Sequence, residues 1–325
     1  MTFRAFRIAD DKQPGRVVDA TLDELTPGDV VIDVAYSSVN YKDALAGTGS
    51  AKILRRFPLV GGIDLSGAVQ SSTDARFRAG QPVVVTGYDL GVAHDGGYAS
   101  TARVPADWVV PLPERLDPFE AMTIGTAGFT AALSIVELEH NGLTPAAGPV
   151  IVTGATGGVG SLAVSCLSRL GYTVTALTGK DGEHAFLRSL GAADVIARAG
   201  LQMSTRPLEK ATWAGAVDAV GGDILAWLTK TMNYGGAIAN SGLTAGTELR
   251  TTVLPFILRG VKLLGIDSVM CPMPRRLEVW RRLASDMKPP QLRSIATEIS
   301  LDALPSAFDT LLKGQARGRF VVKVS

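Results

Sequence analysis

The chain has 325 residues with a formal net charge of +1, and 46% of its residues are hydrophobic. This length suits two domains with a large core, and the near-neutral charge without basic runs argues against a nucleic-acid-binding protein. No segment reaches the roughly 20 apolar residues of a membrane helix, and residues 1–7 lack the apolar centre of a secretory signal. We therefore expect a cytoplasmic protein with no membrane partner.

Residues 1 to about 120 have the pattern of a β-rich region. Short alternating or apolar segments are separated there by Pro-Gly, Ala-Gly and Gly-Gly breaks. The predicted strands are 3–8, 17–18, 30–35, 68–71, 82–87 and 98–104. Two polar features stand out: Asn40-Tyr41-Lys42-Asp43 at the start of a helical turn, and Asp64 in an apolar, glycine-bounded strand. A buried acid such as Asp64 needs a partner.

From residue 117 the pattern changes to helices alternating with strands. A long helical stretch over 118–136 leads into the predicted strands 150–152, 172–177, 195–196, 215–220, 236–240 and 261–266. Helices are expected between them at 161–170, 184–190 and 224–232. This alternation predicts a parallel, doubly wound sheet. A helix at 274–287, a strand at 295–299, a helix at 304–312 and a strand at 320–324 are expected to close the chain.

A glycine-dense turn follows the strand at 150–152 and precedes a helix rich in Leu, Ala and Val. Ala155, Gly157 and Gly160 fit the G-x-G-x-x-G fingerprint with alanine in the first place. Strand, glycine turn and helix together are the context that dinucleotide binding needs, because the helix start presents unpaired N–H groups to a pyrophosphate. A tight turn that serves packing alone is the other interpretation.

The residues after the second strand of this region indicate which dinucleotide binds. An NAD enzyme places Asp or Glu there for the ribose 2′-hydroxyl, whereas this chain has Thr178-Gly179-Lys180, with Arg198 after the next strand. Two cations and a hydroxyl suit the 2′-phosphate of NADPH. Asp181 beside Lys180 leaves NADH open, and both cations could instead be solvated surface charges.

The chain resembles the zinc-free, quinone oxidoreductase-like branch of the medium-chain dehydrogenase/reductase superfamily, and in particular its acryloyl-coenzyme A reductase (YhdH/YhfP-type) group. The resemblance covers the whole chain and rests on the stretches 40–45, 124–131, 153–160, 255–259 and 265–270. It implies an α/β fold: a GroES-like β-rich catalytic domain at 1–121, completed by 292–325, and a doubly wound Rossmann NADP-binding domain at 122–291. Zinc enzymes of the superfamily carry Gly-His-Glu where this chain has Gly62-Ile63-Asp64, so the resemblance implies no metal.

The resemblance also implies roles for individual residues. Tyr41 and Thr126 would lie against the nicotinamide, Leu243 and Ser268 would make further contacts on the nicotinamide side, and Arg319 would lie near the cofactor. The remaining cofactor contacts are the pyrophosphate site Thr156, Gly157, Gly158, Val159, Gly160 and Ser161, and the 2′-phosphate site Thr178, Gly179, Lys180 and Arg198.

The activity implied by the resemblance is NADPH-dependent reduction of the carbon–carbon double bond of acryloyl-CoA to propanoyl-CoA. Hydride would add at the β carbon, and charge would develop on the thioester carbonyl oxygen. We hypothesise that Tyr41 donates a hydrogen bond or proton and that Asp43 holds the polar network. Alternatively, Tyr41 stacks on the nicotinamide and Asp43 caps a helix. Candidates for binding the CoA phosphates are Lys52, Arg55, Arg56, Arg317 and Arg319.

Two other functions stay open at the level of sequence: reduction of quinones or small activated alkenes, and a non-enzymatic NADPH-binding sensor. The polar side chains at 40–43 favour chemistry over sensing. The predicted strand at 261–266 would lie at a sheet edge, and an exposed apolar edge invites pairing. Because relatives join these edges, we expect a homodimer.

Overall fold

The computed structural model describes residues 2–324, which form two compact units. Within the described residues, unit 1 contains 2–126, 269–280 and 292–324, and unit 2 contains 127–268 and 281–291. The sequence-based boundary at residue 121 lies close to the end of the first segment of unit 1. The segment Val269–Trp280 was expected in the nucleotide domain, but it packs with unit 1.

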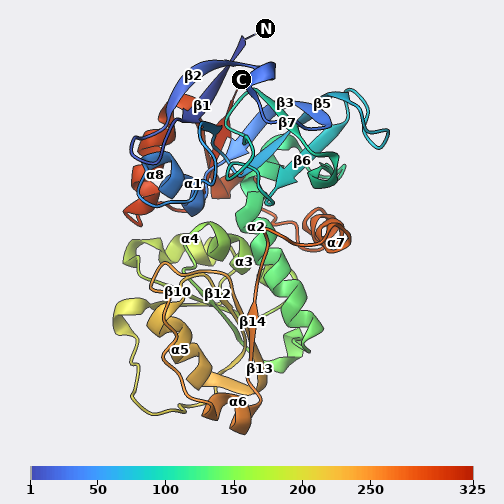
Figure 1. Cartoon of the computed structure of the whole chain (residues 1–325). Helices are drawn as coiled ribbons and strands as arrows, with labels where there is room; N and C mark the ends of the chain where they lie inside the picture. The colour runs from blue at the N-terminus through green and yellow to red at the C-terminus, as the bar shows by residue number, and fades with distance from the viewer. Residues whose placement is uncertain (1, 325) are drawn as a thin grey trace. The chain divides into compact units, whose positions relative to one another are not determined.

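Unit 1 is β-rich, as the short alternating segments predicted. One of its sheets has three strands in the order β2-β1-β4, and the other has seven strands in the order β15-β16-β3-β5-β6-β8, with β7 paired to β3 (Figure 1). The strands of this unit are β1 Thr2–Ile8, β2 Arg16–Thr21, β3 Val30–Ser38, β4 Leu59–Val60, β5 Asp64–Ser72, β6 Pro82–Thr86, β7 Thr101–Val104, β8 Val110–Pro111, β15 Ala296–Ser300 and β16 Arg319–Lys323.

The helices α1 (Tyr41–Thr48) and α8 (Leu304–Leu312) pack against each other in unit 1. Gly47 allows this close approach, because a Cβ there would lie 2.3 Å from the ring of Phe308. Phe308 in turn packs edge-on against Phe6, with ring centroids 5.7 Å apart. This packing fixes α1, whose first turn carries the polar side chains of the predicted catalytic segment.

Helix α7 (Met273–Leu283) explains why Val269–Trp280 belongs to unit 1. Arg276 on this helix is fully buried and donates hydrogen bonds to the carbonyl oxygen of Thr86 at 2.8 Å and to its hydroxyl at 3.0 Å. Its guanidinium also lies 4.4 Å from the ring centroid of Tyr88. A buried cation needs such partners, and Thr86 at the end of β6 and Tyr88 after it, both in unit 1, provide them.

Unit 2 has the parallel, doubly wound sheet that the alternating pattern predicted. Its six strands follow the order β11-β10-β9-β12-β13-β14, and every neighbouring pair is parallel. Strand β14 lies at one edge, as expected for the segment 261–266. The elements are β9 Val150–Thr153, α3 Gly158–Arg169, β10 Val174–Thr178, α4 His184–Ser189, β11 Asp194–Ala197, β12 Trp213–Asp218, α5 Gly222–Thr231, β13 Met232–Asn240, α6 Leu254–Arg259 and β14 Lys262–Gly265 (Figure 1).

The remaining helix, α2 (Pro118–His140), is interrupted at Gly125, whose φ of 48° and ψ of −159° are not helical. The sequence predicted no segment apolar enough for a membrane helix, but by length and composition alone this helix could cross a membrane. Its most apolar 18 residues are, however, 89% buried inside the protein. That burial is the property of a core helix. The break at Gly125 falls where Asp64 of β5 approaches, and it shapes the polar cluster described below.

Candidate active site

The turn between β9 and α3 has the geometry expected of an anion-binding fingerprint. Gly154 adopts a left-handed φ of 58°, and a Cβ on Gly160 would lie 2.3 Å from the carbonyl oxygen of Gly154. Only glycine at 160 therefore allows α3 to start this close to the strand. The first N–H groups of a helix have no intrahelical acceptor, so those of Gly158, Val159 and Gly160 are available to a phosphate. Thr156 and Ser161 are buried beside them.

The residues predicted to hold a 2′-phosphate are brought together at the ends of β10 and β11. Thr178 pairs with Ala197 across the two strands, which places Arg198 next to the following residues of β10. The guanidinium of Arg198 comes within 3.1 Å of the position that a Cβ on Gly179 would take. The hydroxyl of Thr178 accepts a hydrogen bond from the backbone N–H of Lys180 at 3.1 Å.

Burial lowers the pKa of the Lys180 ammonium, while Glu183 acts in the opposite direction. Two cations beside a glycine backbone and a hydroxyl form a cradle that fits the extra phosphate of NADPH.

Asp218, at the end of β12, organises the loops on this side of the sheet. Its buried carboxylate accepts hydrogen bonds from the hydroxyl of Thr153 at 2.5 Å, the backbone N–H of Gly221 at 2.9 Å and the side-chain amide of Asn240 at 2.6 Å. The carboxyl ends of three parallel strands are thereby tied together, which is where doubly wound sheets bind ligands. The sequence analysis missed Asp218, although an acid ending the apolar run Gly-Ala-Val was a signal.

Leu243 and Ser268 lie in different surroundings of unit 2. Leu243 follows β13 and its side chain is 58% exposed. Ser268 is buried, and its hydroxyl accepts a hydrogen bond from the hydroxyl of Thr130 at 2.7 Å. Their expected contacts with the nicotinamide stay predictions.

In unit 1, Asp64 is the centre of a buried polar cluster. Its side chain is completely buried. It accepts hydrogen bonds from the hydroxyl of Ser38 at 2.6 Å and the amide of Asn40 at 2.8 Å. The backbone N–H of Thr126 donates to it at 2.9 Å and the hydroxyl of Thr126 at 2.5 Å. The structure thus provides the partners that a buried acid at this position requires.

Gly125 makes room for this cluster. A Cβ at this position would lie 2.7 Å from each of the Arg319 guanidinium, the Asp64 carboxylate and the Ser38 hydroxyl. The break in α2 also turns the N–H of Thr126 away from its own helix and towards Asp64. Thr126, expected beside the nicotinamide, is therefore held by the acid through both its backbone and its side chain.

Arg319, expected near the cofactor, is the cation of this buried cluster. Its guanidinium donates to the carbonyl oxygens of Thr123 at 3.2 Å and Val39 at 2.9 Å, to the side-chain oxygen of Asn40 at 3.1 Å and to the hydroxyl of Ser38 at 2.7 Å. It lies 3.7 Å from the carboxylate of Asp64. Because its side chain is only 3% exposed, this placement favours a supporting role, and direct contact with a cofactor stays a prediction.

Asp43 belongs to the first turn of α1, and it is buried. One carboxylate oxygen accepts from the backbone N–H of Asn40 at 2.9 Å and from its side-chain amide at 3.1 Å, and the other accepts from the N–H of Ile63 at 3.0 Å. Burial, reinforced by the charge of Asp64, raises the pKa of Asp43 to about 7 despite these donors. The amide of Asn40 thus bridges two carboxylates, and Asp43 both caps α1 and joins the cluster.

Tyr98 is a further member of this cluster that the sequence analysis did not single out. Its hydroxyl donates to the carbonyl oxygen of Ser38 at 3.1 Å. Burial, followed by the charges of Asp43 and Asp64, raises the pKa of Tyr98 well above its ordinary value. The Gly96-Gly97 pair before it was the available signal, because a Cβ on Gly97 would lie 2.1 Å from the carbonyl oxygen of Asp64.

Tyr41 differs from its neighbours because it faces outward. It is the first residue of α1, and its side chain is 39% exposed. Among the residues that the structure describes, its hydroxyl has no hydrogen-bond partner, whereas Asn40 and Asp43 on either side are engaged with the cluster. The phenol is thus held on a rigid support with its donor available.

Within residues 2–324, no group of three or more His, Cys, Asp or Glu side chains could hold a metal ion. The carboxylate of Asp64 already accepts hydrogen bonds from Ser38, Asn40 and Thr126, and the charge of Arg319 lies close to it.

Two family models match the chain. The alcohol dehydrogenase GroES-like domain matches residues 26–114, and the zinc-binding dehydrogenase model matches residues 158–285.

Two relatives match nearly the full length. The chain is 51% identical to YhfP of Bacillus subtilis, which carries a quinone oxidoreductase name, over 99% of this chain and 98% of YhfP. It is 47% identical to the acrylyl-CoA reductase AcuI of Ruegeria pomeroyi over 99% of both chains.

Solved structures agree with this similarity. The YhdH oxidoreductase from Salmonella enterica in complex with NADP superposes with a TM-score of 0.96 at 48% identity and covers 100% of both chains. The YhfP structure with NAD bound gives a TM-score of 0.96 at 49% identity over 99% of both chains.

Proposed function

The chain belongs to the medium-chain dehydrogenase/reductase superfamily, in the group of YhfP, YhdH and acrylyl-CoA reductases, and we propose that it reduces acryloyl-CoA to propanoyl-CoA with NADPH. The observation that carries the cofactor assignment is that Arg198 lies beside Gly179, the residue before Lys180 in the chain. The substrate assignment rests on full-length similarity to an enzyme named for this reaction.

NADPH supplies the hydride that adds to the β carbon of the double bond, and a proton added at the α carbon completes propanoyl-CoA. The α3 N-terminus and the Lys180–Arg198 pair hold the phosphates of the cofactor. In unit 1, the phenol of Tyr41 donates to the substrate as charge develops on its carbonyl oxygen. Asp43, Asn40 and Asp64 are positioning residues, because they fix the start of α1 without an exposed donor of their own.

Turnover tests this assignment directly. Oxidation of NADPH is followed with acryloyl-CoA and with a simple quinone at matched concentrations, and NADH replaces NADPH in a parallel series. We expect turnover with acryloyl-CoA and NADPH. Turnover with the quinone alone would transfer the function to quinone reduction, for which the name of YhfP is the supporting observation. Equal use of NADH would contradict the phosphate-site assignment, and the NAD in the YhfP structure makes this series necessary.

The donor role of Tyr41 predicts that Tyr41→Phe lowers kcat by about tenfold to a hundredfold, since a positioned proton donor contributes this much or more. The KM for NADPH should stay unchanged, because the ring that faces the cofactor remains. Lys42→Met, at the next position of the same helix, is the matched control and should retain kcat. An unchanged kcat in Tyr41→Phe would dismiss the donor role.

We further propose a homodimer formed through the β14 edge of unit 2. Beside this edge strand, α6 and the residue before it carry apolar side chains with large exposed fractions: Val253 at 66%, Ile257 at 68% and Leu258 at 54%. Such a surface next to an unpaired strand edge favours a second copy of the chain. Light scattering should give a dimer mass and a monomer mass for Ile257→Asp, whereas Leu277→Asp on α7 should remain dimeric. A monomeric unmodified protein would refute the proposal.

We also place the protein in the cytoplasm. Cys166 and Cys271 are both buried and not joined in a disulfide, which suits a reducing compartment.

A further inference from the structure

Unit 1 contains a pocket of about 620 Å³ beyond the C-terminal end of α1, lined by Asp11, Lys52, Ile53, Leu54, Arg55 and Phe57. Lys52 to Phe57 belong to the segment between α1 and β4, and Asp11 belongs to the loop between β1 and β2. The volume lies within the range typical of pockets for small organic ligands. None of these residues takes part in the Asp64 cluster, so this is a separate place on the same unit.

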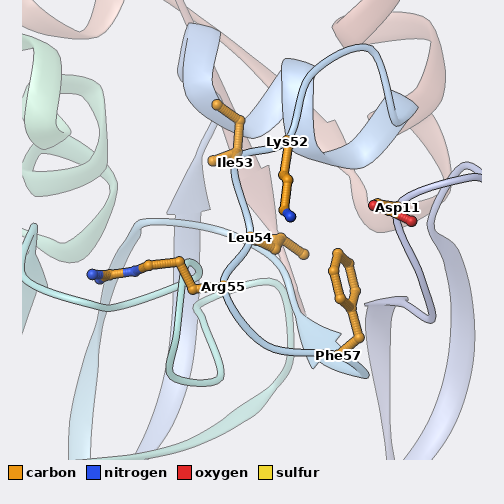
Figure 2. A pocket seen from close by; sticks show the side chains of 6 residues that line it. All are labelled: Asp11, Lys52, Ile53, Leu54, Arg55 and Phe57. Carbon is orange, nitrogen blue, oxygen red and sulfur yellow. The ribbon is translucent and has the colours of Figure 1, made fainter.

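Lys52 is the cation available in this pocket. Figure 2 shows its ammonium group pointing into the space between Leu54, Phe57 and Asp11. It forms no hydrogen bond or ion pair with any residue in the range 2–324. Arg55 points to the other side in the same view, where its guanidinium is paired with Asp89, and its backbone N–H donates to Val92 at 2.9 Å. Arg55 therefore fixes the conformation of the loop between α1 and β4, and the ammonium group of Lys52 is available to bind a ligand.

The other walls of the pocket suit a flat, heteroaromatic group. Phe57 offers a partly exposed ring, and Leu54 offers a buried apolar side chain beside it. Asp11 offers a carboxylate on the opposite side, which has no hydrogen-bond partner within residues 2–324. A base that stacks on Phe57 would gain dispersion and stacking energy, and an exocyclic amine could donate to Asp11. Lys52 and Asp11 face each other without pairing, which leaves space for a ligand with both a phosphate and an amine.

We propose that this pocket binds the nucleotide end of the acyl-CoA substrate: the adenine lies against Phe57, its amine donates to Asp11, and a phosphate accepts from Lys52. The proposal rests on the proposed acyl-CoA reductase function. It agrees with the geometry of unit 1, because α1 starts at Tyr41 and its eight residues extend about 12 Å before the chain reaches Lys52. The long pantetheine arm of CoA separates thioester from phosphates, so one substrate needs two such places.

The test compares acryloyl-CoA with acryloyl-pantetheine, which carries the same thioester without the nucleotide. Lys52→Ala should raise the KM for acryloyl-CoA about tenfold, since it removes one charge-assisted hydrogen bond. The kcat, the KM for acryloyl-pantetheine and the KM for NADPH should not change. Phe57→Leu, which keeps an apolar side chain but removes the ring, should raise the same KM by loss of stacking. Lys313→Ala, an exposed lysine on the turn after α8, is the matched control.

Three kinetic results for Lys52→Ala would overturn the proposal: an unchanged KM for acryloyl-CoA, an equal rise in KM for both thioesters, or a rise in the KM for NADPH alone. The last would assign the pocket to the nucleotide of the cofactor instead. If the unmodified enzyme reduces neither thioester, the proposed function fails, and calorimetric titration with adenosine 3′,5′-bisphosphate still decides the subsite. Binding that Lys52→Ala weakens supports the pocket as a nucleotide site, and absence of binding to the unmodified protein contradicts it.

Discussion

The polar cluster of unit 1 and the phosphate-binding turn of unit 2 differ in whether their polar groups already have hydrogen-bond partners within the protein. Around Asp64, side chains from β3, α1, α2 and β16 satisfy one another, and the only outward donor described above is the phenol of Tyr41. In the turn after β9, glycines bring backbone N–H groups forward and leave them without acceptors until a ligand arrives. The cluster therefore holds its side chains in fixed positions, whereas the turn has backbone N–H groups available to bind an anionic ligand.

This difference separates two kinds of mutational effect. A change in the cluster leaves a buried charge without its partner, so it should reduce the stability of the fold. A change in the turn removes space or charge that a ligand uses, so it should reduce cofactor affinity more than stability.

The largest loss of stability is expected for Asp64→Ala. It leaves the buried Arg319 guanidinium without its carboxylate, and it removes the acceptor of the hydrogen bonds from the Ser38 hydroxyl and the Thr126 backbone N–H. Breaking a buried pair on one side costs about 3–5 kcal/mol of unfolding free energy, measurable by urea unfolding. Asp302→Ala, which breaks an exposed ion pair with Arg4, should cost less than about 1 kcal/mol. Equal losses in the two variants would show that the cluster is not a stabilising centre.

The pH dependence of stability should reveal Asp43. Its pKa is raised from 3.8 to about 7 on folding, so between these values the folded protein binds more protons than the unfolded chain. Stability should therefore fall as the pH rises from about 4 to about 7, by a few kcal/mol from this group. Asp43→Asn removes the titrating group and should flatten the profile in this window. A profile unchanged by this substitution would mean that Asp43 stays ionised in the folded protein.

Gly160→Ala should weaken NADPH binding by about tenfold to a hundredfold. The new Cβ would meet the backbone of Gly154 and Ala155 at 2.3 Å and 2.6 Å, and overpacking of this kind costs about 1–3 kcal/mol. Fluorescence titration of NADPH measures the effect. Gly265→Ala in β14, where a Cβ meets nothing within 4 Å, is the control and should bind normally. Unchanged affinity in Gly160→Ala would contradict the role of the turn.

The smallest predicted effect concerns cofactor choice. Lys180→Ala should lower the ratio of kcat/KM for NADPH to that for NADH about tenfold, because one charge-assisted contact to the 2′-phosphate is lost. Arg198→Ala should act in the same direction, and Arg188→Ala on α4 should leave the ratio unchanged. If NADPH and NADH lose efficiency equally in Lys180→Ala, the lysine does not read the 2′-phosphate.

The two regions also differ in how far the sequence predicts them. The phosphate-binding turn depends on residues that are neighbours in the chain, because strand, glycines and helix follow one another. The fingerprint and the start of α3 could therefore be predicted from the sequence alone. The 2′-phosphate site needed one further step, the pairing of Thr178 with Ala197 that places Arg198 beside Gly179. Parallel neighbouring strands make such a step predictable.

The cluster around Asp64 depends on contacts between distant segments. The sequence indicated that this acid needs a partner, but not that Arg319 from β16 and Thr126 from the broken helix α2 supply it. The predicted helix at 118–136 was correct in place, yet its break at Gly125 depends on the crowding of Asp64, Ser38 and Arg319. Tyr98 and Asp218 were missed for the same reason, because their importance comes from buried neighbours rather than from a local pattern.

The carbon atom that receives the hydride distinguishes the proposed reaction from other reductions. The enzyme is given acryloyl-CoA and NADPH with deuterium at the transferred position of the nicotinamide, and the propanoyl-CoA formed is analysed by mass spectrometry and NMR. The account predicts one deuterium at the β carbon and a solvent proton at the α carbon. Deuterium at the α carbon, or propanoyl-CoA without deuterium, would contradict it.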